Sequence, residues 1–303
     1  MQYCIVGAGA VGLSVAAALT QAGFPVDILA RGENLSALKR NGIRILHGNT
    51  TETVFPVRAF AAEEYGRKPD IIFVSVKGYS LESILPILRQ ISDAHTVIIP
   101  LLNIYGTGAR LQAALPASLV TDGCVYIAAS KTAAGTVARQ GEIFKIVFGA
   151  RDQKEYRPIL AKIARDLRQA SIEPLLSTFV QRDTLKKYAY VSPMAAAGLY
   201  FDADAGTFQQ TGAPRETFKA LMREIEALAQ AMGCPFDTDI VQTNLDILDA
   251  LRADASTSMQ RDIRAGHQSE LDGLVFTPVR LGKQYGVPTP RYAEIAAKFG
   301  FQL

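Results

Sequence analysis

Residues 2–31, QYCIVGAGAVGLSVAAALTQAGFPVDILAR, contain the pattern that decides the fold. The apolar run YCIV leads into the glycine-rich turn GAGAVG, and an apolar, alanine-rich stretch follows. Alanine and leucine favour helix, whereas Gly23 and Pro25 end the helical stretch before the strand-like run VDILA. The segment therefore predicts a strand, a helix and a second strand, which together form one βαβ unit of a parallel sheet.

The glycines of this turn have the spacing GxGxxG, directly after a predicted strand and at the start of a predicted helix. In that setting the first glycine permits a tight turn, the second lets the backbone approach a pyrophosphate, and the third allows close packing of helix on strand. The helix N-terminus offers its N–H groups to the anion. We expect a dinucleotide to bind at Gly7, Gly9, Ala10, Val11 and Gly12. The alternative is a tight turn that binds nothing.

The end of the second strand indicates which dinucleotide binds. NAD enzymes usually carry an Asp or Glu about 20 residues beyond the turn, where it holds the ribose 2′-hydroxyl. Here Asp27 lies within the predicted strand, too early for that role, and Arg31 occupies the expected region. Because a guanidinium group suits a 2′-phosphate, the sequence favours NADP(H). The alternative is that Arg31 is an ordinary solvated charge.

The remaining chain divides by texture into two parts. Strand-like runs at 43–47, 54–60, 70–76 and 96–102 alternate with helical stretches, and shorter β-like pieces follow over 123–149. This alternation predicts an α/β domain with a Rossmann-type doubly wound sheet over residues 1–178. Strand signals are missing beyond that point, so residues 179–303 are predicted to form an all-α domain.

Composition excludes several classes of protein. The 303 residues, 49% hydrophobic and 20% charged, indicate a globular chain of about two domains. A net charge of +3 is too balanced for a protein that binds nucleic acid or an anionic membrane. Three scattered cysteines without a Cys/His cluster predict neither disulfides nor a metal site, and they favour a cytoplasmic location. No apolar run reaches the roughly 18 residues of a membrane span.

Two further polar residues follow predicted strands of the sheet. Lys77 comes after DIIFVSV and Asn103 after TVIIPLL. Ligands of such sheets bind outside the carboxyl ends of the strands, so both positions are candidates for a binding site. Each residue alone is also compatible with an ordinary loop.

Together with the glycine turn and Arg31, these residues carry a resemblance to a known family. From Gly7 to at least Pro288 the chain resembles the ketopantoate reductases, which are NADP-dependent 2-dehydropantoate 2-reductases. The resemblance implies hydride transfer from NADPH to the ketone of 2-dehydropantoate, giving pantoate, in pantothenate biosynthesis. It also implies that Arg31 and Lys77 lie by the 2′-phosphate of the cofactor, while Asn103 contacts the nicotinamide side and the substrate.

The predicted helical domain contains the other residues that the resemblance singles out. The family's Trp-x-Lys is matched best with Lys187 as the lysine and Leu185 in the Trp position, and Lys186 is the less favoured register. The run STSMQRDIRAGHQSELD, residues 256–272, resembles a family signature and places Ser258 and Glu270 in it.

Each of these residue types suits the implied reaction. An ammonium such as that of Lys187 can stabilise the negative charge on a reduced ketone oxygen and deliver the proton. The Ser258 hydroxyl suits a substrate carboxylate, and Glu270 can accept a hydrogen bond from a substrate hydroxyl or hold the lysine. On one continuous helix, at about 100° per residue, Ser258 and Glu270 would not face the same ligand. They converge only if Ser258 lies at a helix end or the helix is irregular. His267 is expected to be an exposed helix residue.

Several departures from the family pattern fall near the implied substrate site. Ile104 stands where many members have Gly, the chain has no Trp, and Val191 and Ala195 stand where Asn is common. A substrate hydroxyl that loses its partner costs about 1–3 kcal/mol. Two alternatives therefore stay open: a reductase of another 2-oxo acid or of an imine, as in opine-type dehydrogenases, and a non-catalytic NADP(H) sensor. The apolar helical segments are also compatible with a homodimer.

Overall fold

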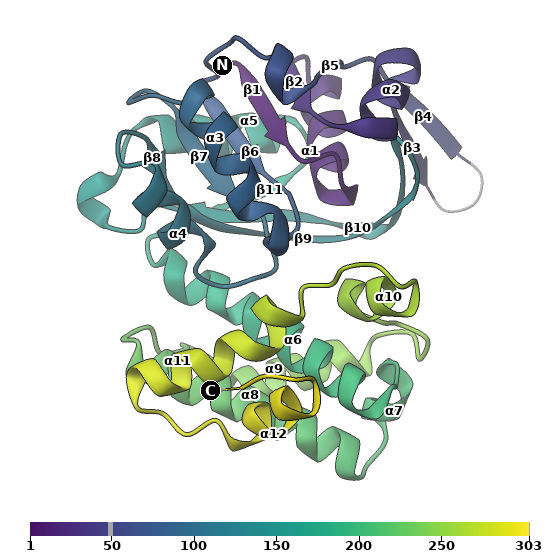
Figure 1. The fold of residues 1–303 in the computed structure, drawn as a ribbon, viewed down its shortest axis with the longest axis vertical. Helices are drawn as coiled ribbons and strands as arrows, with labels where there is room; N and C mark the ends of the chain where they lie inside the picture. The colour runs from purple at the N-terminus through teal and green to yellow at the C-terminus, as the bar shows by residue number, and fades with distance from the viewer. Residues whose placement is uncertain (48–50, 303) are drawn as a thin grey trace. The chain divides into compact units, whose positions relative to one another are not determined.

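A computed structural model describes residues 1–47 and 51–302, which form two compact units. The first unit takes residues 1–102 and 106–180, and the second takes the chain from Gln181 onward (Figure 1). The division falls close to the predicted boundary at residues 178 and 179. The segment Asn103–Tyr105 was predicted to lie in the first domain, but it groups with the helical unit.

A six-stranded parallel sheet forms the centre of the first unit. Its strand order is β5-β2-β1-β6-β7-β8, and every neighbouring pair is parallel. Five of its six strands are buried along their whole length, as expected for a sheet covered on both faces. The strand order reverses at β1, the position at which doubly wound sheets bind their ligands. The strands are β1 (Tyr3–Val6), β2 (Val26–Leu29), β5 (Arg58–Phe60), β6 (Ile71–Val74), β7 (Val97–Pro100) and β8 (Leu119–Val120).

A second, five-stranded sheet was not predicted as a separate layer. Its order is β11-β10-β3-β4, with β9 paired to β10. The run at 43–47 was expected to join the parallel sheet, but it forms β3, which pairs with β4 in antiparallel fashion. Burial along β3 falls toward its exposed end, a pattern that suits a half-covered sheet. The strands are β3 (Ile43–His47), β4 (Thr51–Phe55), β9 (Asp122–Ala133), β10 (Thr136–Gly149) and β11 (Glu173–Leu176).

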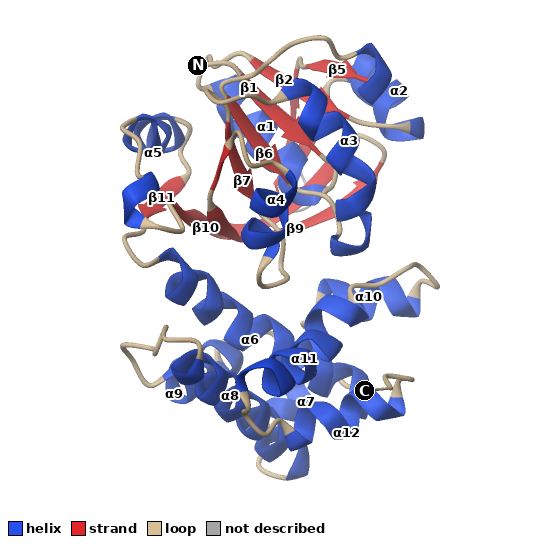
Figure 2. Cartoon of the chain, turned by 60° about the vertical axis from the view of Figure 1, so that its left-hand side comes forward, coloured by secondary structure: helices blue, strands red, loops and turns tan. Residues whose placement is uncertain are grey.

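Helix α1 (Ala10–Gln21) contacts strands of both sheets. Its residues from Gly12 to Leu19 are all buried, and a helix buried on every side must be apolar all round. Its alanines are small enough to let two sheets approach one helix. Figure 2 shows the strands in red and the helices of the same unit in blue. The other helices are α2 (Gly32–Asn41), α3 (Leu81–Ile91), α4 (Thr107–Ala114) and α5 (Ile159–Gln169), with short 3-10 turns η1 (Ala62–Glu64), η2 (Gly78–Ser80) and η3 (Gln153–Glu155).

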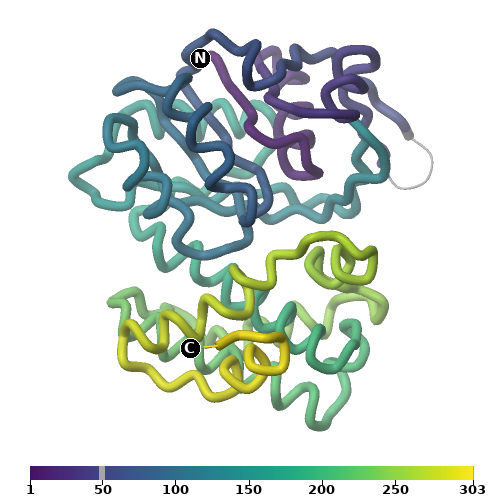
Figure 3. The backbone as a smooth tube through the Cα atoms, viewed as in Figure 1, coloured from purple at the N-terminus to yellow at the C-terminus, as the bar shows by residue number. Residues whose placement is uncertain are grey.

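The described part of the second unit is helical, as predicted (Figure 3). A five-residue π-helix interrupts it before α11, a feature that the sequence analysis did not predict. No helix within the described ranges is long and apolar enough to cross a membrane. The elements are α6 (Val180–Phe201), α7 (Ala205–Gln209), α8 (Ala213–Ala231), α9 (Ile240–Asp249), α10 (Ser258–Arg264), the π-helix η4 (Asp272–Phe276), α11 (Thr277–Tyr285) and α12 (Pro290–Lys298).

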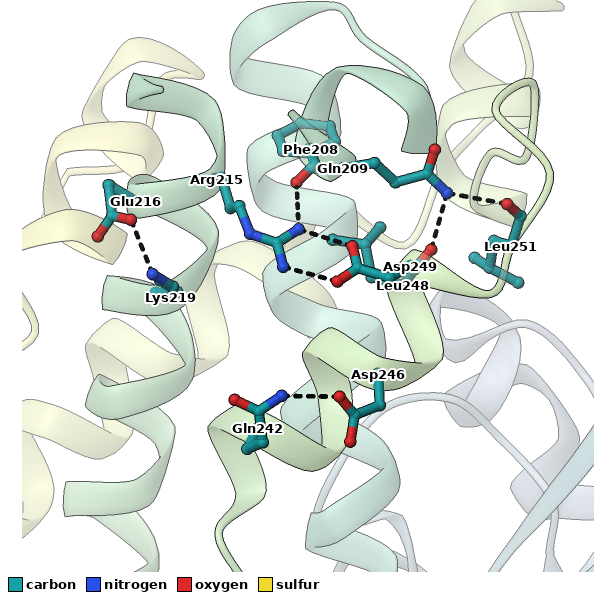
Figure 4. A network of polar contacts seen from close by, with 10 residues as sticks. All are labelled: Phe208, Gln209, Arg215, Glu216, Lys219, Gln242, Asp246, Leu248, Asp249 and Leu251. Atoms are coloured by element: carbon teal, nitrogen blue, oxygen red, sulfur yellow. Dashed lines mark hydrogen bonds and ion pairs between the residues drawn. The ribbon is translucent and has the colours of Figure 1, made fainter. Parts of the chain in front are cut away.

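A polar network ties α7, α8 and α9 together (Figure 4). The guanidinium of Arg215 donates to both carboxylate oxygens of Asp249 over 2.7 Å and to the carbonyl oxygen of Phe208 over 3.0 Å. The amide of Gln209 donates to two carbonyl groups in and just after the last turn of α9. Carbonyls at a helix end lack their regular helical donors, so the Gln209 bonds help to satisfy this end of α9 and join it to α7.

Candidate active site

The glycine turn lies between β1 and α1, where the sequence predicts it. Gly7 has a φ of +116°, and a Cβ atom there would lie 2.8 Å from the carbonyl carbon of Ser75. A Cβ on Gly12 would lie 2.1 Å from the carbonyl oxygen of Gly7. Packing within the protein alone therefore requires glycine at both positions.

Gly9 differs from the other two glycines. A Cβ there would meet nothing nearer than the Ser75 carbonyl oxygen at 3.8 Å. Gly9 is the N-cap of α1 and provides no side-chain cap, so the N–H groups of Ala10, Val11 and Gly12 belong to an uncapped first turn. Open space beside an uncapped helix N-terminus is the arrangement that a pyrophosphate needs.

Ser75 holds this turn, and the sequence analysis missed it. Its hydroxyl donates to the carbonyl oxygen of Gly7 over 2.9 Å, and its N–H donates to the carbonyl oxygen of Val6 over 2.9 Å. The signal was a small polar residue directly after an apolar strand, two positions before Lys77. Its role depends on β6 pairing with β1, which the sequence alone does not specify.

Arg31 and Lys77 follow the two strands that flank β1. Arg31 is the exposed N-cap of α2, just beyond β2, and Lys77 is the partly buried N-cap of η2, just beyond β6. Since β2 and β6 are both parallel to β1, their carboxyl ends and the glycine turn meet at one edge of the sheet.

Asp27 is a structural carboxylate, as its position within the strand suggests. It is fully buried in β2, 2.7 Å from the Nε of Arg58, and it accepts a hydrogen bond of 3.0 Å from the hydroxyl of Tyr65. A buried carboxylate with these partners is not available to a ribose.

In the helical unit, Lys187 meets Asn103. The Lys187 ammonium donates to Oδ1 of Asn103 over 2.7 Å, and both residues are partly buried. The neighbouring Lys186 instead forms ion pairs with Asp237 at 2.6 Å and Asp183 at 3.5 Å. Of the two registers that the sequence left open, the one with Lys187 brings an ammonium to Asn103.

Tyr105 anchors the Asn103–Tyr105 segment to the helical unit. Its ring lies 6.0 Å from that of Tyr188, centroid to centroid, and it forms a side-chain hydrogen bond with Cys234. Burial raises the pKa of the Cys234 thiol, and the contact with Tyr105 opposes that rise. Asn103 therefore reaches Lys187 from a segment that is fixed two residues away.

The π-helix η4 docks on α6 through two hydroxyls. Pro278 has no N–H, so the carbonyls four and five residues before it, those of Leu274 and Gly273, lose their helical donors. The Ser192 hydroxyl donates to the Leu274 oxygen over 2.6 Å, and the Tyr188 hydroxyl donates to the Gly273 oxygen over 2.7 Å. These bonds fix η4 against the helix that carries Lys187.

A second proline on α6 is compensated in the same way. Pro193 removes the donor for the Ala189 carbonyl, and the buried amide of Asn244 replaces it over 3.0 Å. Because Ser192 uses its own proton on η4, the Tyr292 hydroxyl donates to Ser192 over 2.6 Å. Burial raises the pKa of Tyr292 well above its usual value, which keeps this donor protonated.

The departures from the family pattern leave apolar side chains along α6. Leu185, in the Trp position, is buried in the core together with Ala195, and Val191 is partly buried. None of the three can donate or accept a side-chain hydrogen bond.

Ser258 and Glu270 do not share one helix. Ser258 is the first residue of α10, whose N-cap Thr257 exchanges hydrogen bonds with Gln260 in a capping box. Helix α10 ends at Arg264, and the buried Glu270 lies just before η4. Ser258 thus meets the condition set from the sequence, a position at a helix end. His267 is exposed as expected, but it lies in the connecting loop and not on a helix.

The described residues, 1–47 and 51–302, contain no group of three or more His, Cys, Asp or Glu arranged to hold a metal ion.

Comparisons with known proteins match both units. Residues 3–153 match the family model described as "Ketopantoate reductase PanE/ApbA", and residues 180–300 match "Ketopantoate reductase PanE/ApbA C terminal". The chain is 25% identical over 290 residues to "Uncharacterized oxidoreductase YkpB" of Bacillus subtilis, covering 96% of this chain and 95% of that protein. It is 25% identical over 295 residues to a 2-dehydropantoate 2-reductase of Aquifex aeolicus, covering 96% and 93%.

The fold is also that of a solved D-mandelate dehydrogenase in a ternary structure with NADH and anilino(oxo)acetate. The TM-score is 0.88 at 20% identity, over 98% of this chain and 96% of the other. With both units matched over most of their length, the chain belongs to the ketopantoate reductase (PanE/ApbA) family of oxidoreductases.

Proposed function

We propose that this protein is an NADPH-dependent reductase of a small 2-oxo acid, with 2-dehydropantoate as the first candidate substrate. The observation that carries the proposal is the 2.7 Å hydrogen bond between Lys187 and Asn103. It brings the ammonium of Lys187 to Asn103, three residues beyond the end of β7, whereas Lys186 forms ion pairs with Asp237 and Asp183. The Aquifex relative is a 2-dehydropantoate 2-reductase, which supports the first candidate.

The cofactor is assigned to the glycine turn of the first unit. Gly9 leaves room for a pyrophosphate, and Arg31 and Lys77 supply positive charge at the ends of the flanking strands. When bound, the dihydronicotinamide supplies the hydride. We assign the 2′-phosphate to Arg31, because a guanidinium pairs with phosphate through two parallel hydrogen bonds. The mandelate dehydrogenase with the same fold holds NADH, so the choice of nucleotide is part of the test.

Lys187 is assigned to the oxygen of the ketone. As that oxygen gains electron density, the ammonium stabilises the developing charge and transfers a proton to it, which leaves a neutral amine and an alcohol. Asn103 accepts one N–H of the ammonium and so restricts its orientation. Ser258 is assigned to the substrate carboxylate, and Glu270 to a substrate hydroxyl or to the lysine.

One observation favours a second substrate class, 2-oxo acids with an apolar side chain. Val191 and Ala195 offer no hydrogen bond, and Ile104 adds a branched apolar side chain next to Asn103. A substrate hydroxyl buried without a partner against such residues would cost about 1–3 kcal/mol. The solved dehydrogenase with the same fold was captured with anilino(oxo)acetate, whose side chain is aromatic.

The experiment is to follow NADPH oxidation by its absorbance with 2-dehydropantoate and with aliphatic and aryl 2-oxo acids, each repeated with NADH. Rapid turnover of 2-dehydropantoate supports the first candidate. A higher kcat/KM for an apolar oxo acid supports the second. Turnover only when an amine is added would assign imine reduction. Tight NADPH binding without turnover of any of these substrates would contradict an enzymatic function and support that of a non-catalytic NADP(H) sensor.

A further inference from the structure

A contact between Ile104 and Gly273 links two segments that each bond to α6, one at Lys187 and one at the next residue, Tyr188. A Cβ atom on Gly273 would lie 2.2 Å from Cγ2 of Ile104 and 3.0 Å from its Cβ. Real Cβ atoms do not approach other atoms so closely, so the Ile104 side chain occupies the space that any larger residue at position 273 would need.

The backbone does not require glycine at position 273. Gly273 has no positive φ, and it lies inside the helical stretch of η4. Glycine is among the least favourable residues in a helix interior, because it loses the most backbone freedom on folding. The close approach of Ile104 is thus the feature of the structure that explains glycine here.

Both partners of this contact are connected to the candidate site. Ile104 directly follows Asn103, whose Oδ1 accepts from Lys187. The carbonyl oxygen of Gly273 accepts from Tyr188, the residue after Lys187. The N–H of Leu274 donates to the carbonyl of Glu270 over 3.0 Å, so Gly273 lies on the turn that follows Glu270.

We propose that Ile104 and Gly273 are positioning residues, a side chain and its matching vacancy, that together set the position of Asn103 relative to Lys187. Tyr105 anchors one end of the segment through Cys234, and the Ile104–Gly273 contact fixes its middle residue, directly beside Asn103. A hydrogen bond weakens steeply with small displacements, and a misplacement of about 1 Å can cost about 100-fold in rate. The catalytic consequence rests on the function proposed above.

The first test is a set of size exchanges at the two positions. In Gly273→Ala we expect a kcat lower by about 30- to 100-fold, because the new methyl group displaces Ile104 and with it Asn103. Ile104→Val keeps Cβ and Cγ2, and we expect it to stay within about 3-fold of the unchanged protein. Ile104→Ala removes Cγ2, and combining it with Gly273→Ala should return the kcat to within about 3-fold of Ile104→Ala alone.

A matched control separates this effect from a general cost of the exchange. Gly66 has no positive φ and no atom within 4 Å of an added Cβ, so Gly66→Ala should leave the kcat unchanged. Near-normal turnover in Gly273→Ala, or losses that simply multiply in the double variant, would overturn the proposal. If Gly273→Ala does not fold, the comparison of Ile104→Val with Ile104→Ala and with the double variant still decides.

The second test does not depend on any enzymatic activity. The rate at which the Lys187 amine reacts with acetic anhydride is measured against pH by mass spectrometry in the cofactor-free protein. We expect Gly273→Ala to change the rate and the apparent pKa of Lys187, the double variant to restore them, and Lys186 to stay unchanged as the internal reference. If the reaction rate of the Lys187 amine and its dependence on pH are the same in Gly273→Ala as in the unchanged protein, the positioning role is overturned. Absence of oxo-acid reduction in the unchanged protein, with these labelling shifts present, would instead overturn the proposed function.

Discussion

The glycine turn and the Lys187–Asn103 pair are built in opposite ways. The turn occupies six consecutive residues and offers backbone groups, so its geometry depends on the lack of side chains at Gly7 and Gly12. The pair joins residues 84 positions apart and depends entirely on two side chains. An added methyl group within the turn should therefore damage the first region, whereas removal of either side chain of the pair should damage the second.

Removing the ammonium should give the largest effect. In Lys187→Ala we expect the kcat to fall by about 10³-fold, in the range for loss of a general acid. The dissociation constant of NADPH, measured by fluorescence titration, should stay within about 2-fold, because the glycine turn is in the other unit. Lys186→Ala is the matched control and should lose the ion pair with Asp237 but retain turnover. Normal turnover in Lys187→Ala together with inactive Lys186→Ala would reverse the assignment.

Two alanines in the glycine turn should separate packing from binding. Gly9→Ala has room for its methyl group in the protein, so we expect a normal Tm but an affinity for NADPH lower by at least about 10-fold, since the methyl occupies the space of the pyrophosphate. Gly12→Ala places a methyl 2.1 Å from the Gly7 oxygen and should lower the stability itself. Overpacking of this kind costs about 1–3 kcal/mol. Thermal unfolding and cofactor titration of both variants check this, and equal losses of affinity at equal Tm would contradict it.

Charge reversal at Arg31 tests the nucleotide preference. Arg31→Asp should raise the KM for NADPH by about 10- to 100-fold, the equivalent of the 1.5–3 kcal/mol of a hydrogen bond to a charged group. The KM for NADH should change far less, since NADH has no 2′-phosphate. Arg40→Asp, at the other end of the exposed face of α2, is the control for a general charge effect. Equal changes with both nucleotides would exclude Arg31 from the 2′-phosphate.

The smallest effect is expected at the Arg215–Asp249 pair, which lies outside both regions. The hydrogen bond from Arg215 lowers the pKa of Asp249 below its ordinary value of 3.8. Because the folded pKa is the lower one, the stabilisation is present above pH 3.8 and is lost as the pH falls through the folded pKa. Asp249 is 46% exposed, so Asp249→Asn should cost only about 0.5–1 kcal/mol near pH 7.

Urea unfolding at pH 7 and at pH 3 or below checks this sign. The stability difference between Asp249→Asn and the unchanged protein should shrink in acid as the Asp249 carboxylate is protonated. Asp254→Asn, which breaks a fully exposed pair with Arg252, should have no measurable effect at either pH. A difference that grows in acid would contradict the assignment.

The sequence predicted the parallel sheet well because its strands are short, continuous apolar runs. It did not predict the second sheet, since the run at 43–47 indicates a strand but does not specify its partners, which are β4 and β10. Ser75 escaped notice for a similar reason: its hydroxyl matters only because β6 lies beside β1. The π-helix depends on Pro278, but also on hydroxyls from α6 that satisfy the freed carbonyls.

By itself, the sequence determined the βαβ unit, the glycine turn and the division into a sheet-containing part and a helical part. These features follow from local propensity and from residue spacings within about 30 residues. Such signals are local in the sequence and do not depend on packing against distant segments. Only the tertiary structure decided that Lys187 and not Lys186 meets Asn103, and that Ile104 fits against Gly273. The physical reason is that a side chain acquires its partner from packing between distant segments. Two adjacent lysines of a helix point to different faces, and which of them meets a given residue depends on which segment packs against each face.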